Sequence, residues 1–185
     1  MELTNEQAQE YLRRIAQGEE KALRELHRLL GRRIYAFALN RLHDPDESEA
    51  IVSDTLYEIW KHPTRFRGES RFSTWVLGIA RYKILTNLRS RTPEYEELDE
   101  QMPSDDLGSF DVLADKERRE GILHCMERLS EVHRECLHLV FYEELSLAEI
   151  AQIQDCPENT VKTRLFHARL KIKNCLERFL KRESP

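Results

Sequence analysis

The sequence predicts an all-α fold of two small helical domains joined by a flexible acidic linker. Apolar residues recur at helical spacing through most of the 185 residues, and no useful stretch shows the alternation typical of β-strands. Glycine and proline, which interrupt helices, number only six each. Helical periodicity is lost between residues 92 and 115, where acidic residues, Pro93 and Pro103 indicate a solvated linker. We therefore expect domains at residues 1–91 and 116–185.

The first domain is expected to contain four helices. The first two are separated at Gly18, where the apolar periodicity breaks. A third should begin after Asp44, because an acidic residue followed by Pro45 suits a helix N-terminus, and it should end before Pro63. The fourth is predicted from about Ser73 to Arg91, with the apolar stripe Trp75, Val76, Ile79, Ala80, Ile84 and Leu88.

In the second domain, residues 145–172 have the layout of a helix-turn-helix. Ser146 can cap a short helix, Asp155 falls at the turn, and Pro157 suits the first turn of the next helix. That second helix would turn basic and aromatic residues toward solvent near its N-terminus, as a DNA recognition helix does. An ordinary surface helix with a solvated basic face is the alternative. The candidate DNA contacts are Asn159, Thr160, Lys162, Thr163, Arg164, Phe166, His167 and Arg169.

Charge is distributed unevenly along the chain. The net charge of −5 argues against a nucleic-acid partner, since lysine and arginine must neutralise phosphates. Residues 61–91, however, carry eight basic residues against one acidic residue, and residues 156–182 carry eight against two. Residues 92–117 hold ten acidic residues and one lysine. Two basic modules are therefore separated by an acidic segment.

Several other classes of protein are disfavoured. No apolar stretch is long enough for a membrane span, and the first residues lack the order of a signal peptide, so we expect a cytoplasmic protein. No nucleophile with a base and no glycine-rich phosphate loop is evident, so we expect neither enzyme activity nor a cofactor. A transcription regulator with an αβ sensor domain remains an alternative, although no strands are indicated.

The four cysteines are expected to be free thiols, because they are few and scattered and a reducing compartment disfavours disulfides. They are Cys125, Cys136, Cys156 and Cys175. A metal site remains an alternative, since His133 and Cys136 share one helical face, but ligands at the spacing of a closed site are missing. We therefore expect no metal. The residues of that alternative are His124, Cys125, His133, Cys136 and His138.

Two motifs resemble one known family. Residues 72–91, FSTWVLGIARYKILTNLRSR, closely resemble the promoter-melting helix of extracytoplasmic-function sigma factors, with its pattern F-x-T-W-L-x-x-I-A-R-N. The helix-turn-helix contains E-I-A and C-P-x-x-T-V-K-x-R-L-x-x-A-R, which look like the terminal domain of that family. The motifs occur in the expected order, and the resemblance extends from about Asn5 to Leu180.

The resemblance implies that the chain binds core RNA polymerase, which supplies the catalysis, and that its two domains read the −10 and −35 elements of promoters. It also implies an anti-sigma partner and a signal-responsive regulon. The implied polymerase contacts are Ser53, Asp54, Leu56 and Trp60. The implied −10 contacts are Phe66, Arg67, Ser70, Arg81, Tyr82, Lys83, Arg89 and Arg91. Of these, Arg81, Lys83, Arg89 and Arg91 would hold phosphates, and the −35 contacts are the helix-turn-helix candidates above.

At three places the chain departs from the family pattern. Ser53-Asp54 stands where Gln-Glu is frequent, and Tyr82 replaces a frequent asparagine beside the pocket for a flipped base. His167 occupies a frequent arginine position and cannot form the bidentate fork of an arginine. Promoter preference is therefore expected to differ at these positions. Trp75 and Ile79 are expected to belong to the core and not to contact bases.

Overall fold

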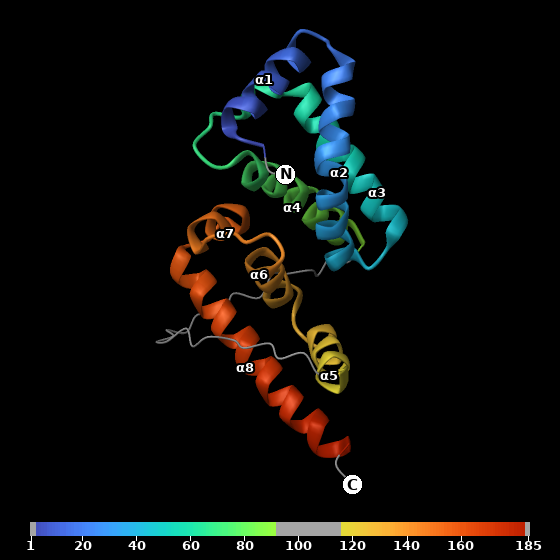
Figure 1. Cartoon of the computed structure of the whole chain (residues 1–185), viewed down its shortest axis with the longest axis vertical. Coiled ribbons are helices and arrows are strands. Elements are labelled where there is room, and N and C mark those ends of the chain that lie inside the picture. The colour runs from blue at the N-terminus through green and yellow to red at the C-terminus, as the bar shows by residue number, and fades with distance from the viewer. Residues whose placement is uncertain (1–2, 92–115, 184–185) are drawn as a thin grey trace. The chain divides into compact units, whose positions relative to one another are not determined.

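The computed structural model describes residues 3–91 and 116–183, and this part of the chain is helical and contains no strand (Figure 1). The all-α prediction is therefore confirmed. The predicted linker, residues 92–115, lies outside the described residues. The helices are α1 Asn5–Ala16, α2 Glu20–Leu42, α3 Pro45–Lys61, a short 3-10 helix Pro63–Arg65, α4 Phe72–Arg91, α5 Lys116–Glu127, α6 Glu131–Phe141, α7 Leu147–Gln154 and α8 Glu158–Glu183.

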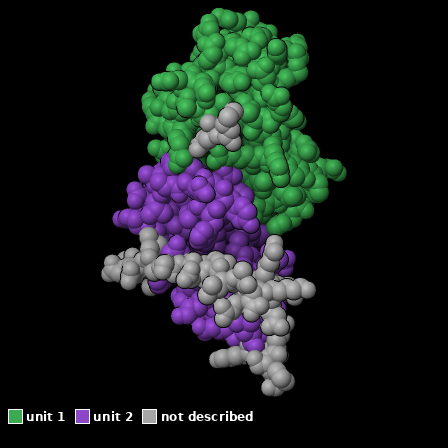
Figure 2. Space-filling view, viewed as in Figure 1, with its two compact units in different colours: residues 1–96, 152–155 green, residues 97–151, 156–185 purple. Residues whose placement is uncertain are grey.

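The chain divides into two compact units, coloured separately in Figure 2. The first comprises residues 1–96 and 152–155, and the second comprises residues 97–151 and 156–185. The helices α1 to α4 thus belong to the first unit. The predicted domain boundaries themselves stay a prediction.

In the first unit, α2 packs against α3 and α4, and α1 packs against α2. The helix boundaries follow local signals in the sequence. The Asp44 carboxylate accepts the Glu47 backbone N–H at 3.0 Å, with Pro45 in the first turn of α3. The helix ends at Lys61, two residues before Pro63. The core is filled by large apolar side chains that are at most 1% exposed: Leu26, Ile34, Phe37, Ile59, Phe72, Leu77 and Ile84.

The break expected at Gly18 is confirmed, with a φ of 82° that favours glycine. An ion pair closes the corner between α1 and α2. The Arg14 guanidinium donates to both carboxylate oxygens of Glu19, at 2.5 and 2.9 Å. This bonding lowers the pKa of Glu19 and favours its charged form.

The predicted helix-turn-helix is present and is formed by α7 and α8. The Glu149 N–H donates to Ser146 Oγ at 3.3 Å, and the Glu149 carboxylate accepts the Ser146 N–H at 2.9 Å, which forms a capping box before α7. Asp155 adopts a φ of 50° at the turn, a conformation that aspartate tolerates better than most residues. Val161, Leu165 and Ala168 of α8 are buried, as the apolar pattern predicts.

The prediction that all four cysteines are free thiols is wrong for two of them. A disulfide joins Cys125 of α5 to Cys175 of α8, with 5.8 Å between their Cα atoms. The two helices pack closely, and a Cβ on Gly121 would lie 2.8 Å from Leu176 Cδ1. The bridge spans 50 residues of sequence, so spacing alone did not indicate it.

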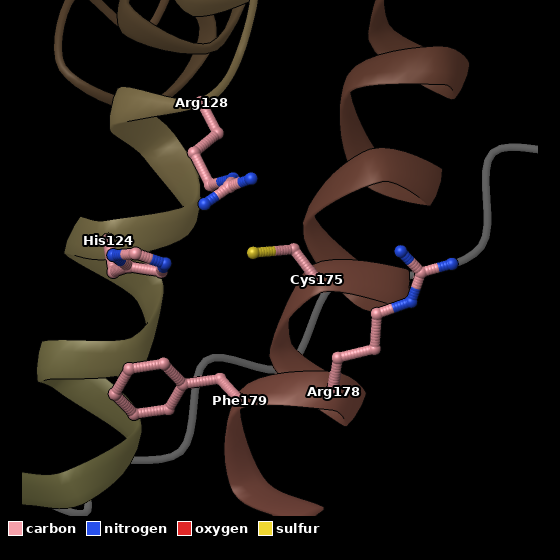
Figure 3. Close-up of a pocket in the computed structure, with 5 residues that line it drawn as sticks. All are labelled: His124, Arg128, Cys175, Arg178 and Phe179. Carbon is pink, nitrogen blue, oxygen red and sulfur yellow. The ribbon is translucent and has the colours of Figure 1, made fainter. Parts of the chain in front are cut away.

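The two cysteines of this bridge differ in exposure. Cys125 is 1% exposed, whereas Cys175 is half-buried and lines a pocket together with His124, Arg128, Arg178 and Phe179. In Figure 3 the Cys175 sulfur is directed from α8 toward α5, and the Arg128 guanidinium extends into the space between the two helices. A reductant would therefore reach Cys175 first.

We predict that reduction destabilises the second unit. A bridge across 50 residues restricts the unfolded chain, so its reduction should lower the free energy of unfolding by about 2–4 kcal/mol. Urea unfolding of the oxidised protein, with and without dithiothreitol, measures this difference. The control is the double variant Cys125→Ala/Cys175→Ala, whose unfolding should not respond to dithiothreitol.

Thiol counts in denaturant test the pairing itself. The oxidised chain should show two reactive thiols, from Cys136 and Cys156, and the reduced chain should show four. Four thiols in the oxidised chain would contradict the disulfide.

Candidate nucleic-acid interfaces

The helix α4 has one buried side and one partly exposed side. Val76, Ala80 and Ile84 are at most 1% exposed and face the core. Trp75 and Ile79 are half-buried and not in the core, which corrects the sequence prediction. The buried side instead includes Leu77 and Leu85, so the helix is rotated relative to the predicted stripe.

Tyr82 extends this partly exposed side of α4. Spacings of four and three residues place Trp75, Ile79 and Tyr82 on one face of a helix. The Tyr82 side chain is 66% exposed, so its ring is accessible to a partner. The face thus offers rings and an aliphatic side chain on which nucleobases can stack. We call Trp75, Ile79 and Tyr82 the stacking face.

The loop that precedes α4 borders the stacking face. Phe66 of this loop is only 8% exposed, and its ring lies 5.1 Å from that of Phe72 and 5.3 Å from that of Trp75. The predicted DNA contact Phe66 is therefore largely enclosed and supports the loop from within. Arg67 is exposed and Ser70 is half-buried, so both can reach a ligand.

The four predicted phosphate-binding cations of α4 differ in exposure and in ion pairing. Arg81 is 6% exposed, so its guanidinium belongs to the interior of the unit, and we withdraw it as a phosphate contact. Lys83 is partly exposed, and its Nζ lies 3.6 Å from Glu58 of α3. Arg91 forms an ion pair of 2.7 Å with Glu47.

Arg89 is exposed, and within residues 3–91 and 116–183 the structure records no ion pair for it. Its charge is therefore not offset by an acidic partner in the described chain. Of the four cations, Arg89 is the most readily available for phosphate.

On α3, three of the four predicted polymerase contacts are exposed. Ser53 and Asp54 lie at the surface, and Trp60 is 47% exposed. Leu56 is 6% exposed because it belongs to the buried stripe of α3, so it cannot contact a partner and we withdraw it. Sequence reasoning missed Tyr57, which is 52% exposed, with its ring centroid 5.7 Å from that of Trp60.

The missed residue could have been found by its spacing. Tyr57 lies three residues from both Asp54 and Trp60, which places all three on one side of α3. We call Ser53, Asp54, Tyr57 and Trp60 the outer face of α3. Exposed aromatic rings beside an acidic residue are typical of a protein-binding surface.

The N-terminal part of α8 presents most, but not all, of the predicted DNA contacts. Thr163 is 6% exposed, and its hydroxyl donates to the Asn159 carbonyl at 3.0 Å. Arg164 is 5% exposed, with its Nη1 3.6 Å from Cys156 Sγ. Both flank the buried stripe of α8, so they stabilise the helix-turn-helix, and we withdraw them as base contacts.

The other predicted residues of α8 remain accessible. Asn159 is exposed at the start of the helix, and the others are half-buried. The His167 ring lies 5.5 Å from the Phe166 ring and 6.4 Å from that of His133. The accessible set is Asn159, Thr160, Lys162, Phe166, His167 and Arg169.

Comparison with known families matches both units. Residues 26–94 match Sigma-70 region 2, and residues 119–172 match Sigma-70 region 4. The chain is 27% identical over 172 residues to the ECF RNA polymerase sigma factor SigK of Mycolicibacterium vanbaalenii, covering 89% of this chain and 87% of that protein. It is 28% identical over 199 residues to the RNA polymerase sigma-H factor of Pseudomonas aeruginosa, covering 97% and 98%.

Two solved structures share the fold. One is the sigma factor RpoE in complex with the anti-sigma factor NepR from Bartonella quintana, with a TM-score of 0.63 and 24% identity over 85% of this chain and 98% of that one. The other is CnrH in complex with the cytosolic domain of CnrY, with a TM-score of 0.63 and 16% identity over 91% and 96%.

These matches define the class of protein. The chain belongs to the sigma-70 family of promoter-recognising RNA polymerase subunits, which are transcription initiation factors and not enzymes. Within that family it is an extracytoplasmic-function sigma factor, as the resemblance of its two motifs predicted.

The alternatives from the sequence are less well supported. A regulator with an αβ sensor would need strands, whereas the described part of the first unit is helical and matches Sigma-70 region 2. Cys125, a candidate ligand of the metal alternative, is bonded to Cys175 and therefore has no thiolate to offer a metal. Among the described residues, no group of three or more candidate ligands could hold a metal ion. No helix in those residues has the length and apolar character needed to cross a bilayer.

Neighbouring residues of α3 provide a test of these assignments. Leu56→Ala removes a buried side chain and should lower the free energy of unfolding by about 2–5 kcal/mol. Tyr57→Ala removes an exposed side chain and should change it by about 0.5 kcal/mol or less. Chemical denaturation followed by circular dichroism measures both. Equal losses from the two substitutions would contradict the assigned rotation of α3.

Proposed function

We propose that this chain binds core RNA polymerase through the outer face of α3 and reads the −10 element with the stacking face and the preceding loop. It reads the −35 element with α8 and so starts transcription of a signal-responsive regulon in the bacterial cytoplasm. The observation that carries the proposal is the match of both units to sigma-70 regions, with aromatic and basic side chains accessible on each.

The docking role of α3 is supported by its chemistry. Residues 44–60 contain six acidic residues and neither lysine nor arginine, which favours a basic partner surface. Tyr57 and Trp60 add apolar area of the kind that contributes most to protein interfaces. Ser53 and Asp54 lie beside them on the exposed side of the helix.

The reading of the −10 element combines stacking with phosphate contacts. An unpaired base can stack on Tyr82, and such stacking is worth about 1–3 kcal/mol per base. Arg67 and Ser70 supply hydrogen bonds from the loop, and Arg89 supplies a positive charge for the backbone. A tyrosine in place of the frequent asparagine favours stacking over hydrogen-bonded selection of the base.

For the −35 element, α8 offers contacts to bases and to phosphates. Lys162, His167 and Arg169 can donate hydrogen bonds to base edges, and Phe166 can pack on a thymine methyl group. Asn159 and Thr160, at the positive end of the helix, suit phosphates. Thr163 and Arg164 are buried, so the proposed reading surface does not include them.

An anti-sigma factor is the proposed regulatory partner. The solved structures that share this fold include one sigma factor bound to the anti-sigma factor NepR and one protein bound to the cytosolic domain of CnrY. A protein that covered the outer face of α3 would prevent docking on polymerase and keep the factor inactive.

Run-off transcription tests the proposal. Core polymerase with this protein should initiate on a subset of a promoter pool that core polymerase alone leaves silent, because the factor supplies promoter recognition. A Trp60→Ala/Tyr57→Ala variant should lose most of this activity by failing to bind core polymerase in gel filtration. If the wild-type protein initiates on no promoter and forms no core complex, the proposal is wrong.

A second prediction separates base reading from phosphate binding. His167→Ala should alter the preference for −35 sequences, whereas Arg89→Ala should weaken binding to all sequences and reduce the salt slope by about one. Dissociation constants for a panel of promoter variants at several salt concentrations measure both effects. Uniform weakening by both substitutions would refute this division.

A further inference from the structure

We propose that Asn5 is the positioning residue of the −10-reading loop, because its side-chain amide ties the loop and the first residue of α4 to α1. This inference rests on the proposed function of the loop. Asn5 was not among the residues that the sequence indicated as functional.

Both the nitrogen and the oxygen of the Asn5 side-chain amide form hydrogen bonds. Its Nδ2 donates to the Ser70 carbonyl at 2.9 Å and to the Gly68 carbonyl at 3.4 Å. Its Oδ1 accepts the Phe72 backbone N–H at 3.0 Å. Because two carbonyls need donors and one N–H needs an acceptor, this set of partners requires an amide in this orientation.

The Asn5 side chain is not needed to cap α1 and is therefore available to bond to the loop. Thr4 caps α1, with the Gln7 N–H donating to Thr4 Oγ1 at 3.3 Å and the Thr4 N–H donating to Gln7 Oε1 at 3.1 Å. The start of α1 is therefore stabilised without Asn5, its first residue. Ala8 and Leu12 bury the inner side of α1 and fix the helix in place.

The loop lies close against α1. Gly68 has a φ of 78°, and a Cβ built on it would be 3.3 Å from Gln9 Nε2. Glycine thus suits both the backbone conformation and the space available here. The close approach brings the loop carbonyls within reach of Asn5.

The bond to Phe72 acts as a helix cap supplied from another segment. Phe72 is the first residue of α4, and the first N–H groups of a helix have no partner within it. Asn5 satisfies this N–H from 67 residues away. The Phe72 ring is 1% exposed and contacts Phe66 and Trp75, so the same residue joins the cap to the aromatic support of the loop.

One side chain therefore sets the angle at which the loop enters α4. Arg67 and Ser70 lie on the loop, and Tyr82 lies on the helix. Their relative positions determine the shape of the proposed base pocket. Without Asn5 the loop must be ordered when a base binds, which lowers affinity. A loop that can shift to suit different bases also discriminates less between them.

The test compares Asn5→Ala, Asn5→Asp and Gln17→Ala in full-length protein bound to core polymerase. Gln17→Ala is the matched control, since Gln17 is an exposed neutral residue directly after the end of the same helix, away from the loop residues that bond to Asn5. The probes are four single-stranded oligonucleotides that differ at one base of the −10 element of a promoter active in run-off transcription. Fluorescence anisotropy gives the ratio of dissociation constants between the least and the most preferred base.

Asn5→Ala should lower this selectivity ratio about fivefold, the equivalent of one lost hydrogen bond. Asn5→Asp should also lower it, because a carboxylate keeps the acceptor for Phe72 but has no donor for the two carbonyls. Gln17→Ala should leave the ratio unchanged. A merely structural role would change the melting temperature without this loss of base selectivity.

Two outcomes would overturn the inference in distinguishable ways. Full wild-type selectivity in Asn5→Ala, with unchanged binding to core polymerase, would refute the role of Asn5 alone. A wild-type complex that prefers no base would refute the proposed reading of the −10 element, and this inference with it. If Asn5→Ala does not fold, the ratio measured for Asn5→Asp decides in the same way.

Discussion

Burial of one side of α4 is the constraint on which the proposed promoter-reading surface of the first unit depends. Val76, Ala80 and Ile84 are at most 1% exposed, and α4 packs against α2 and α3. A helix fixed on one side has its opposite side fixed as well, so this packing also orients Tyr82. Phe72 and the amide of Asn5 hold the first turn of the same helix. The core of the first unit thus positions its reading surface.

The distribution of charge allows an acidic protein to bind DNA. Within the first unit, acids of α3 offset part of the basic charge around α4. Glu58 approaches Arg65 at 2.6 Å and Lys83 at 3.6 Å, and Glu47 pairs with Arg91 at 2.7 Å. Asp54, on the outer face of α3, and Arg89, near the end of α4, both remain exposed at the surface. One unit can therefore present an acidic surface to polymerase and a basic one to DNA.

Local signals in the sequence predicted the helices well, because caps and turns depend on neighbouring residues. Asp44 with Pro45, Gly18, Ser146 and Asp155 all mark boundaries where they were expected. Burial of single side chains was harder to predict. Arg81, Thr163 and Arg164 lie beside a predicted stripe, and a rotation of about 100° per residue decides which neighbour is enclosed. Leu56 belongs to the apolar pattern of α3 itself, and its burial follows that pattern. Contacts between distant segments, such as the Cys125–Cys175 disulfide and the bonds of Asn5, have no local signal.

The central claim is that one unit offers two distinct surfaces, α3 to polymerase and α4 to DNA. Photo-crosslinking tests it most directly, with a photoreactive phenylalanine analogue in place of either Tyr57 or Tyr82 in a polymerase–promoter complex. We predict that the probe at position 82 links to the non-template strand of the −10 element and that the probe at position 57 links to a polymerase subunit. Crosslinks from position 82 to polymerase alone, with none to DNA, would contradict the account.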